Sequence, residues 1–485
     1  MSGDDPDTLD PSLTRSFGSV EVYKAMCERL YDYDTNVNLV PELAKKLPTI
    51  SKDGLTYTIP LRHGVRFNDG TPFNAQAVKA TIDRDRTIPR SSRAGDYQPV
   101  VSVTALSRYT VAIKLSSPYT PMTKVLASAD GVMMSPTQLD KRGADFGADP
   151  VCVGPFMFDN RLAGYSVTVV RSPYYYHRRF VHLDKVVYMH EPDANSAVAT
   201  LKAGGLQVLD SIPTADIAEL QHTKGLRVMK AKSLGFVAVF VNMGNTGGIG
   251  KPYGTADNVL AKSPKLRQAF EEAIDRNTLN RVVFGGRESP GCTPVSPASP
   301  KFASFDRDIK CTKPDPAGAR KLVAASGIAN PTVHLLTPNQ SEMLRLATFI
   351  QAEENAVGIN VVIDSREAAT GIQLTNQGSF DAYLGFWSGS PDTDRQFFQF
   401  LATQGSLNRS GYSNPRLDTI LANARMATKD KDIASLYRAA QRIILADRPL
   451  IYLYHPVVYG AVATNVRDVE LPFDLLLRLA FAEYR

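Results

Sequence analysis

A glycine-rich segment that ends in a lysine is the first candidate for chemistry in this chain. Residues 244–252 read GNTGGIGKP, a composition typical of loops whose backbone binds phosphate. A phosphate-binding loop needs a glycine five residues before the glycine next to its lysine, and a Ser or Thr after the lysine to hold magnesium. Asn245 and Pro252 stand at those two positions, so the motif fails and we interpret the segment as a flexible loop.

Motifs for nucleophilic and metal chemistry fail as well. Residues 385–389, GFWSG, lack the Gly-x-Ser-x-Gly spacing of a nucleophile elbow. The 7 histidines include no pair at i and i+4 with an acidic residue between them, which argues against a zinc enzyme or a nickel receptor built on histidine ligands. Isolated carboxylates are too common to indicate acid–base catalysis. The sequence therefore predicts no enzyme, no cofactor and no metal site.

Two aromatic clusters are better candidates for binding. Trp387, the single tryptophan of the chain, stands where a predicted strand meets a loop of small polar residues (SGSPD, 388–392). Open α/β sheets bind ligands at the carboxyl ends of their strands, and a broad ring suits a mostly apolar pocket. The alternative is a tryptophan packed in the core beside a turn. In the second cluster Tyr452 and Tyr454 share one face of a predicted strand, which fits sheet packing as well as ligand contact.

The four cysteines carry two different expectations. Cys292 and Cys311 lie close together on a proline-rich stretch, where a disulfide would close a loose loop and stabilise the fold by about 3 kcal/mol in the chain-entropy model. Cys27 and Cys152 each lie within a predicted regular element, and we interpret both as buried free thiols. None of the four has the spacing of a CxxC motif or a zinc site.

Length and composition set the expected number of lobes and argue against several classes of protein. A chain of 485 residues exceeds the roughly 250–300 residues over which one hydrophobic core grows, so two or three lobes are expected. The net charge of +6 comes from scattered basic residues, which argues against nucleic-acid binding. We find no apolar run long enough to span a bilayer and no secretory signal at the first residues. An exported mature chain and a cytosolic protein both fit.

Strands alternate with helices along the chain, which is typical of α/β lobes with partly parallel sheets. Residues 56–62 alternate as in a half-buried strand, and Asn74 is expected to cap a helix that ends near Arg84. The clearest helix begins at Ser263-Pro264 and has one apolar stripe. Residues 285–318 are rich in proline and are expected to be irregular. Further strands are expected at 166–170, 185–190, 236–242, 332–336, 360–364, 381–387 and 451–455, and further helices at 19–30, 194–203, 214–221, 341–357, 372–376 and 432–447.

Residues 67–78, FNDGTPFNAQAV, resemble the signature of the family 5 extracellular solute-binding proteins. These are the peptide, nickel and oligosaccharide receptors of bacterial ABC importers. Further matches follow in order along the chain: TLDP at 8–11, PELA at 41–44, DGLTY at 53–57, VGPF at 153–156, VN at 241–242, LRQAF at 266–270, AIDR at 273–276, GI at 358–359 and the Trp387 loop. The resemblance thus covers nearly the whole chain.

The resemblance implies an α/β protein with the periplasmic-binding-protein fold in its type II, large cluster C form. Two α/β lobes joined by a hinge would enclose the ligand, and an extra small domain would complete the molecule. Carried over to this sequence, domain I contains residues 1–37, 152–239 and 457–485, domain II contains residues 38–151, and domain III contains residues 240–456.

The resemblance also implies partners and a location. The chain would be a monomeric receptor outside the cytoplasm, periplasmic or at the cell surface, with its signal segment absent from this sequence. It would carry a small-molecule or short-peptide ligand to the permease subunits of an ABC importer, would bind no nucleic acid, and would contact the membrane only through a lipid anchor.

The identity of the ligand depends on the loop after Trp387. In peptide-binding members of the family this loop carries an aspartate that pairs with the α-ammonium group of the peptide. Ser390 falls at that position, and a serine cannot make the same charge-assisted hydrogen bond. Asp392 and Asp394 lie nearby but do not match the aspartate. Arg345 falls near the arginine that dipeptide-binding members use for the peptide carboxylate, and a solvated helix arginine is its alternative.

We therefore expect a peptide or peptide-like solute as the ligand. A blocked peptide, a sugar derivative or another polar natural product is the alternative, and so is a receptor-fold protein with an interaction or chaperone role. Cys152 replaces a small residue of the family's turn and is expected to line the cleft. The predicted ligand-binding residues are Phe17, Gly18, Cys152, Gly154, Asn242, Arg345, Trp387, Ser388, Ser390, Asp392 and Tyr454.

Overall fold

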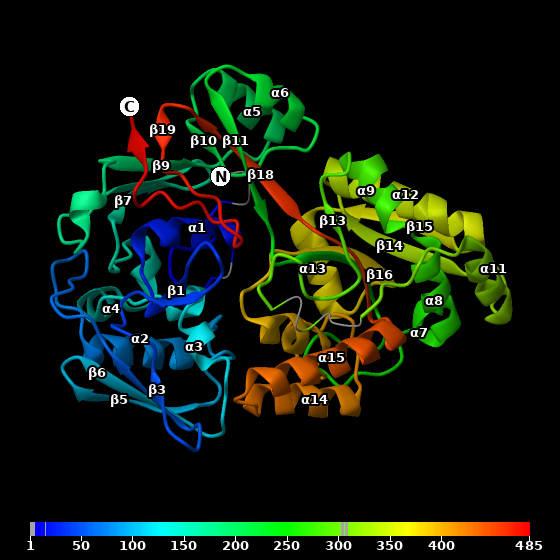
Figure 1. Ribbon diagram of the computed structural model, residues 1–485, viewed down its shortest axis with the longest axis horizontal. Helices are drawn as coiled ribbons and strands as arrows, with labels where there is room; N and C mark the ends of the chain where they lie inside the picture. The colour runs from blue at the N-terminus through cyan, green and yellow to red at the C-terminus, as the bar shows by residue number, and fades with distance from the viewer. Residues whose placement is uncertain (1–4, 15, 302–304, 306–308) are drawn as a thin grey trace. The chain divides into compact units, whose positions relative to one another are not determined.

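The computed structural model describes residues 5–14, 16–301, 305 and 309–485, and these fold into two compact units (Figure 1). Unit 1 contains Met1–Ala231 and Val458–Arg485, and unit 2 contains Lys232–Val457. The chain therefore passes from unit 1 into unit 2 after Ala231 and returns after Val457. Unit 2 is continuous in sequence, whereas unit 1 needs both ends of the chain.

Unit 1 is built from short helices and small antiparallel sheets, in the strand orders β3-β4-β6-β5, β7-β8-β9, β10-β18-β11, β1-β2 and β19-β20. Its helices are α1 (Phe17–Met26), α2 (Ala75–Thr87), α3 (Met122–Val125), α4 (Pro136–Arg142), α5 (Ala194–Lys202) and α6 (Ile217–His222). Its strands are β1 (Tyr31–Tyr33), β2 (Leu39–Pro41), β3 (Thr49–Ile50), β4 (Thr56–Pro60), β5 (Val100–Ser107), β6 (Thr110–Leu115), β7 (Phe156–Leu162), β8 (Ser166–Arg171), β9 (Lys185–Met189), β10 (Val208–Leu209), β11 (Leu226–Lys232), β18 (Val457–Ala463), β19 (Val466–Arg467) and β20 (Glu483–Tyr484).

Local sequence explains the best-defined elements of unit 1. Tyr57 and Ile59 of β4 are buried while their neighbours are partly exposed, which is the alternation expected of a half-buried strand. Asn74 caps α2 by accepting hydrogen bonds from the backbone of Gln76 and Ala77. The helix expected at 19–30 differs from the structure: Ser16 caps α1 and the helix ends at Met26, because Cys27 takes an extended conformation.

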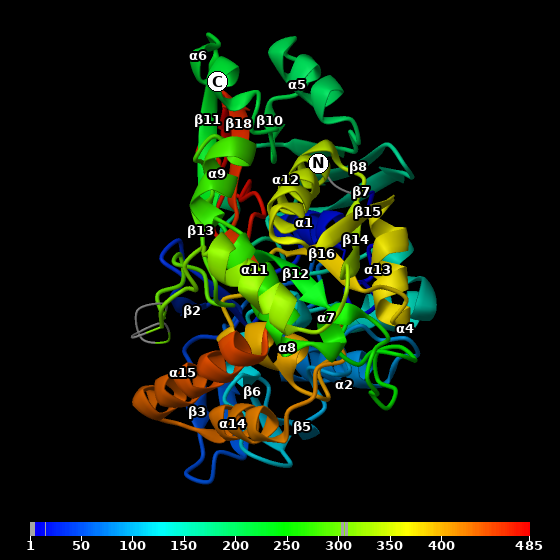
Figure 2. The ribbon, with the colours of Figure 1, turned by 90° about the vertical axis from the view of Figure 1, so that its right-hand side faces the viewer.

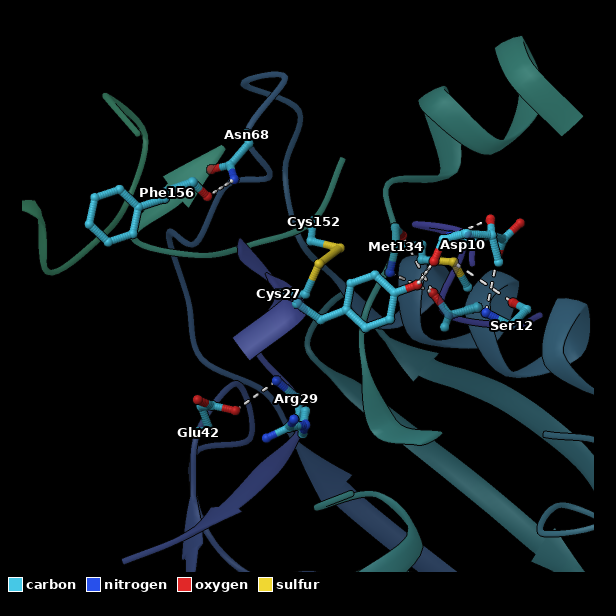
Figure 3. The surroundings of a disulfide bond; sticks show 12 residues. Asp10, Ser12, Cys27, Arg29, Glu42, Asn68, Met134, Cys152 and Phe156 are labelled. Carbon is cyan, nitrogen blue, oxygen red and sulfur yellow. Dashed lines mark hydrogen bonds between the residues drawn. A yellow bond between two sulfur atoms is a disulfide. The ribbon is translucent and has the colours of Figure 1, made fainter. Parts of the chain in front are cut away.

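That extended residue explains a disulfide that the sequence did not reveal. The Glu28 N–H donates to the Val153 carbonyl (2.6 Å), and a Cβ on Gly154 would lie 2.1 Å from the Met26 carbonyl oxygen. The two backbones are therefore in contact, and Cys27 and Cys152 are bonded to each other with their Cα atoms 4.9 Å apart (Figure 3). The interpretation of these two cysteines as free thiols was wrong.

Unit 2 is an α/β layer structure around one sheet with the order β13-β17-β12-β16-β14-β15. Its strands are β12 (Phe236–Val241), β13 (Ser289–Pro290), β14 (Thr332–Pro338), β15 (Asn360–Arg366), β16 (Ala382–Trp387) and β17 (Leu450–His455). Its helices are α7 (Val259–Lys262), α8 (Pro264–Ala273), α9 (Arg276–Phe284), α11 (Pro316–Ala325), α12 (Ser341–Val357), α13 (Ala368–Gln377), α14 (Pro415–Met426) and α15 (Asp430–Asp447).

The sheet of unit 2 is buried on both faces. One core joins alternate sheet residues such as Val239 to helices α8, α9 and α12, and the other joins residues such as Phe240 to α14 and α15. The last two helices lie side by side in both views (Figure 1, Figure 2). Continuous apolar runs like FVAVFV of β12 follow from this double burial.

The sequence located most of these elements. Ser263 caps α8 as expected, with Pro264 at its first position. The expected strand at 451–455 and helix at 341–357 correspond to β17 and α12. The Cys292–Cys311 disulfide is present, with Cα atoms 5.5 Å apart, and it fastens the proline-rich stretch. Part of that stretch, at 302–304 and 306–308, lies outside the described residues.

Candidate functional site

Strand directions gather several chain ends at one edge of the unit 2 sheet. Strands β14, β15 and β16 are parallel, while β12 is antiparallel to β16 and to β17. The carboxyl ends of β14, β16 and β17 therefore meet the starts of β12 and β13 at the same edge. Open α/β sheets bind ligands in loops at such an edge. We call it the Trp387 edge, and its loops contain residues 233–235, 288, 339–342, 387–394 and 455–457.

Trp387 packs against neighbouring rings and also keeps exposed surface, so it fits both the core-packing and the ligand-contact interpretation. It pairs with Phe236 across β16 and β12. Its ring lies 5.6 Å from the Phe236 ring and 5.1 Å from the Phe400 ring, measured between centroids. The side chain remains half-buried. The two neighbouring rings fix the orientation of the indole, while part of it stays exposed.

The loop after Trp387 is held against the start of β12. Gly389 has φ +95, and a Cβ there would lie 2.3 Å from the Gly235 nitrogen, so only glycine fits. A Cβ on Gly235 would in turn lie 1.8 Å from the Trp387 carbonyl oxygen. The Ser233 hydroxyl donates to the Ser388 carbonyl at 2.8 Å. These contacts fix the backbone of the Trp387 loop against residues 233–235.

Ser390 and Asp392 form hydrogen bonds within this loop. The Asp392 N–H donates to Ser390 Oγ at 3.1 Å, and Asp392 Oδ1 accepts from the Asp394 N–H at 3.2 Å. Gln396 Nε2 donates to the Leu234 carbonyl and to the Ser390 carbonyl. Asp392 is buried, whereas Ser390 is partly exposed. Of the predicted polar residues in the loop, Ser388 and Ser390 thus keep exposed surface.

An ion pair anchors the far side of the same loop. Arg425 of α14 donates from Nε and Nη2 to both oxygens of Asp394, at 2.8–3.0 Å. Its guanidinium also lies over the Phe398 ring, 3.1 Å from the centroid. A bidentate pair of this kind fixes orientation as well as charge. Asp394 therefore has a positioning role behind the loop.

Asn242 lies at the other end of β12 and is not brought near Trp387. Its amide donates to the carbonyls of Asn245, Gly378 and Phe380, and its Oδ1 accepts from the Asn245 N–H. The side chain is buried and its hydrogen-bonding capacity is taken up inside unit 2. We therefore leave Asn242 out of the proposed site.

The glycine-rich loop at 244–252 lies at that same far end of β12. It borders a 390 Å³ pocket lined in part by Gly248, Lys251, Asn376 and Arg409. Asn245 holds the loop through bonds to the carbonyls of Thr375 and Arg409. The loop is therefore tied to α13 by specific hydrogen bonds, and the sequence interpretation of it as simply flexible missed this.

Tyr454 is not brought beside Trp387, because the two side chains pack in the cores on opposite faces of the sheet. Tyr454 is buried in β17, and its ring lies 4.8 Å from the Phe284 ring between centroids. Arg345 is exposed on α12, three residues after Glu342, so the two side chains share one face of the helix. Neighbouring His455 donates from Nδ1 to the Gly235 carbonyl (2.7 Å), and burial lowers its pKa to about 4.

Sequence reasoning missed Glu288, which lies at the same edge before β13. Its Oε2 accepts a hydrogen bond from the Val457 N–H at 2.7 Å. Burial raises the pKa of Glu288 to about 8, the hydrogen bond from Val457 opposes the rise, and the charge of Glu342 adds to it. An isolated glutamate carries no sequence signal, so only the strand order reveals this position.

The predicted residues of unit 1 lie at opposite ends of helix α1. Phe17 and Gly18 begin the helix, whereas Gly154 contacts its last residue, Met26. Ten helical residues span about 15 Å, so the structure does not gather these residues into one cluster. Cys152 is only 1% exposed and disulfide-bonded, so the expectation that it lines the cleft is not met. Phe17 is partly exposed.

Comparison with known proteins decides the family. The model of the bacterial extracellular solute-binding proteins, family 5, matches residues 38–408. The chain belongs to this family. The glutathione-binding protein GsiB of Shigella dysenteriae serotype 1 is 30% identical over 472 residues, which cover 95% of this chain and 89% of that protein. GsiB of Escherichia coli K12 shows the same identity and coverage.

Solved structures confirm the fold of this family 5 protein. The dipeptide binding protein of Pseudoalteromonas sp. SM9913, in complex with Met-Leu, has a TM-score of 0.87 at 21% identity, covering 100% of this chain and 99% of that one. DppA of Helicobacter pylori, in complex with the peptide STSA, has a TM-score of 0.86 at 22% identity, covering 99% and 96%. The expected type II periplasmic-binding-protein fold is therefore confirmed.

Within the described ranges, no helix has the length and apolar character needed to cross a membrane. In the same part of the chain, no group of three or more His, Cys, Asp or Glu side chains is arranged to hold a metal ion. Members of family 5 are extracellular or periplasmic solute-binding proteins.

Proposed function

We propose that this family 5 protein is the substrate-binding receptor of an ABC importer, and that it binds a peptide or peptide-like solute at the Trp387 edge. It then delivers the solute to the permease subunits and does no chemistry on it. The half-buried Trp387 carries this proposal, because a supported indole with open surface stands among small polar groups at the carboxyl end of a strand.

The relatives support a peptide-like ligand. The GsiB proteins of Shigella dysenteriae serotype 1 and Escherichia coli K12 are named glutathione-binding proteins, and glutathione is a small peptide. Ser388 and Ser390 offer hydroxyls beside Trp387, and Arg345 offers an exposed guanidinium for a carboxylate. Phe17, Gly18 and Gly154 of unit 1 stay predictions of the family resemblance, since the structure of unit 1 does not bring them together.

The remaining sequence expectations are part of the same proposal. Domain I is assigned residues 1–37, 152–239 and 457–485, domain II residues 38–151, and domain III residues 240–456. Separate hydrophobic cores around Ile113 and around Val167 support a division within unit 1. The proposed location is outside the cytoplasm, with a lipid anchor as the membrane attachment.

Calorimetric titration tests the function directly. Purified protein is titrated with glutathione, with Met-Leu and, as a non-peptide probe, with maltose. A true ligand at one hundred times its Kd stabilises the folded state by about 2.7 kcal/mol, which a thermal melt detects. Binding of the peptides without maltose supports the proposal, and binding of maltose alone would replace the peptide with a sugar.

A pair of variants locates the site. Trp387→Ala is expected to weaken peptide binding at least tenfold while the protein stays folded. Phe386→Ala is the matched control, because successive residues of a strand point to opposite faces and Phe386 is also exposed. If Trp387→Ala unfolds the protein and leaves affinity unchanged in the folded fraction, Trp387 is a packing residue only.

A further inference from the structure

A pocket in unit 2 lies at the end of β12 opposite the Trp387 edge, and its charge is of one sign. The pocket has a volume of 390 Å³ and lies between the glycine-rich loop, the last residues of α13 and the segment 406–409. Pockets of about 300–1,000 Å³ are typical of small-molecule sites. Among the described residues that line this pocket, Lys251 and Arg409 are cations and none is acidic. We call it the Lys251 pocket.

The walls of the Lys251 pocket are held together around Asn245. Its amide nitrogen donates to the carbonyls of Thr375 and Arg409, both at 3.0 Å. Two glycines allow the neighbouring segments to approach, because a Cβ on Gly378 or on Gly411 would lie 2.1 Å from a backbone atom of Asn245. The pocket is therefore formed before any ligand arrives, which favours binding because no wall has to become ordered.

The two cations of the pocket keep most of their donors for a ligand. Arg409 donates from Nε to Asn376 Oδ1 at 2.9 Å, and no described residue bonds its two Nη groups. Neither Arg409 nor Lys251 forms an ion pair with a carboxylate of the described ranges. Burial lowers the pKa of the Arg409 guanidinium, and the nearby Tyr383 opposes this shift. Arg409 is partly exposed and Lys251 is exposed, so an anion can reach both.

The end of α13 accounts for part of this positive charge but not for all of it. The C-terminus of a helix carries about half a negative charge, which favours a nearby cation. Two of its last carbonyls are already bonded, since Thr375 accepts from Asn245 and Asn376 accepts from the Ile249 N–H. Two cations against this half charge leave a net charge of about +1.5.

The size of the excess charge favours a phosphate group over a single carboxylate. A phosphate monoester carries about −1.5 to −2 near pH 7, which balances the pocket, whereas one carboxylate would leave it positive. The planar guanidinium of Arg409 can donate to two phosphate oxygens, and the Lys251 ammonium can reach a third as a point charge. Gly247 and Gly248 in the wall have no side chain to keep an anion at a distance.

We propose that the Lys251 pocket binds a small solute through a phosphate group. The pocket is a second site, separate from the Trp387 edge, because the six residues of β12 place about 17 Å between the two ends of the strand. The proposal goes beyond the receptor function and does not depend on it. The competing explanation is that Lys251 and Arg409 only balance the end of α13.

Three substitutions in the pocket and one outside it separate these explanations. Lys251→Gln and Arg409→Gln each remove one charge and keep a polar side chain. Arg409→Lys keeps the charge but not the paired donors of the guanidinium. Lys321→Gln is the matched control, because Lys321 is exposed on α11 of the same unit and does not line the pocket.

Affinity is measured by calorimetry at low ionic strength with inorganic phosphate, glycerol 3-phosphate and succinate. The wild-type protein is expected to bind both phosphate probes more tightly than succinate. Lys251→Gln and Arg409→Gln should each weaken the phosphate probes about tenfold or more, and Arg409→Lys should weaken them several-fold. Lys321→Gln should change nothing, and the affinity for Met-Leu should be the same in Arg409→Gln as in the wild type. Thermal melts verify that every variant is folded.

Four results would overturn the inference. If the wild-type protein binds neither phosphate probe at millimolar concentration, the two cations only balance the helix end. If succinate binds as tightly as the phosphate probes or more tightly, the recognised group is a carboxylate. If both glutamine variants bind phosphate like the wild type, phosphate binds elsewhere on the protein. If Arg409→Gln weakens Met-Leu in parallel with phosphate, the pocket is not a separate site.

Discussion

Each unit contains one disulfide, and removing the two separately should destabilise the units to different extents. The Cys27–Cys152 bond in unit 1 closes a loop of 125 residues, and the Cys292–Cys311 bond in unit 2 closes a loop of 19. In the chain-entropy model these loops correspond to about 5 and about 3 kcal/mol at 25 °C. Removal of the first bond, by Cys→Ala at both positions, should therefore lower the free energy of unfolding by about 2 kcal/mol more than removal of the second.

The single tryptophan makes the assay specific to one unit. Trp387 lies in unit 2, so its fluorescence reports the unfolding of that unit, while far-UV circular dichroism reports both. Urea titration of the Cys292→Ala, Cys311→Ala variant should lower the midpoint of the fluorescence transition. The Cys27→Ala, Cys152→Ala variant should lower the urea midpoint of the part of the dichroism change that comes from unit 1. It should leave the fluorescence midpoint close to that of the wild type.

Two results would refute this reasoning. If the unit 1 variant loses less stability than the unit 2 variant, loop length does not govern the effect and strain or structure in the unfolded chain dominates. If both variants shift the fluorescence midpoint equally, the units unfold as one cooperative body. A reduced wild-type sample serves as the control, since it should reproduce the sum of the two separate losses.

Four further substitutions test the loop and the core of unit 2. Gly389→Ala should lower the free energy of unfolding by about 1–3 kcal/mol, because its φ of +95 and its contact with Gly235 disfavour a Cβ; an unchanged urea midpoint would contradict this. Asp394→Asn should lower the free energy of unfolding by about 2–3 kcal/mol, because it weakens the bidentate pair with Arg425. Arg425→Lys should also lower the free energy of unfolding, because lysine keeps the positive charge but cannot donate to both carboxylate oxygens in the same geometry. Glu354 is fully buried, and burial followed by the charge of Glu353 raises its pKa well above the usual value, so its stabilising contribution is present below about pH 4.5 and is lost as the pH rises through the folded-state pKa. Glu354→Gln does not titrate, so thermal melts between pH 5 and pH 8 should show the wild type losing stability relative to this variant, and parallel curves would show that the pKa of Glu354 is not raised in the folded state.

Local sequence signals predicted the elements that short-range chemistry determines. Asn74 and Ser263 each cap a helix where expected, because a cap depends only on neighbouring backbone groups. The end of α1 was misplaced, because the Glu28 N–H donates to the carbonyl of Val153, far away in sequence, and Cys27 before it is extended. A tertiary contact thus overrode a local preference for helix.

The candidate site was only partly predictable for the same reason. Trp387 stood out because it is unique and precedes a loop of small residues. Glu288 and the Cys27–Cys152 pair have no such local signature, since their partners are distant in sequence and depend on strand order and chain packing. Asn242 matched the family pattern, yet its amide serves three backbone carbonyls. Pattern matching alone cannot separate a ligand contact from a residue that organises a loop.

The discontinuity of unit 1 has a consequence for the order in which the chain folds as it is synthesised. Strand β18 is the middle strand between β10 and β11, and it comes from residues near the C-terminus. A nascent chain that ends before Val458 has all of unit 2 but leaves β10 and β11 without the strand that joins them. Unit 2 can therefore complete its core first, and unit 1 closes only when the last residues have emerged.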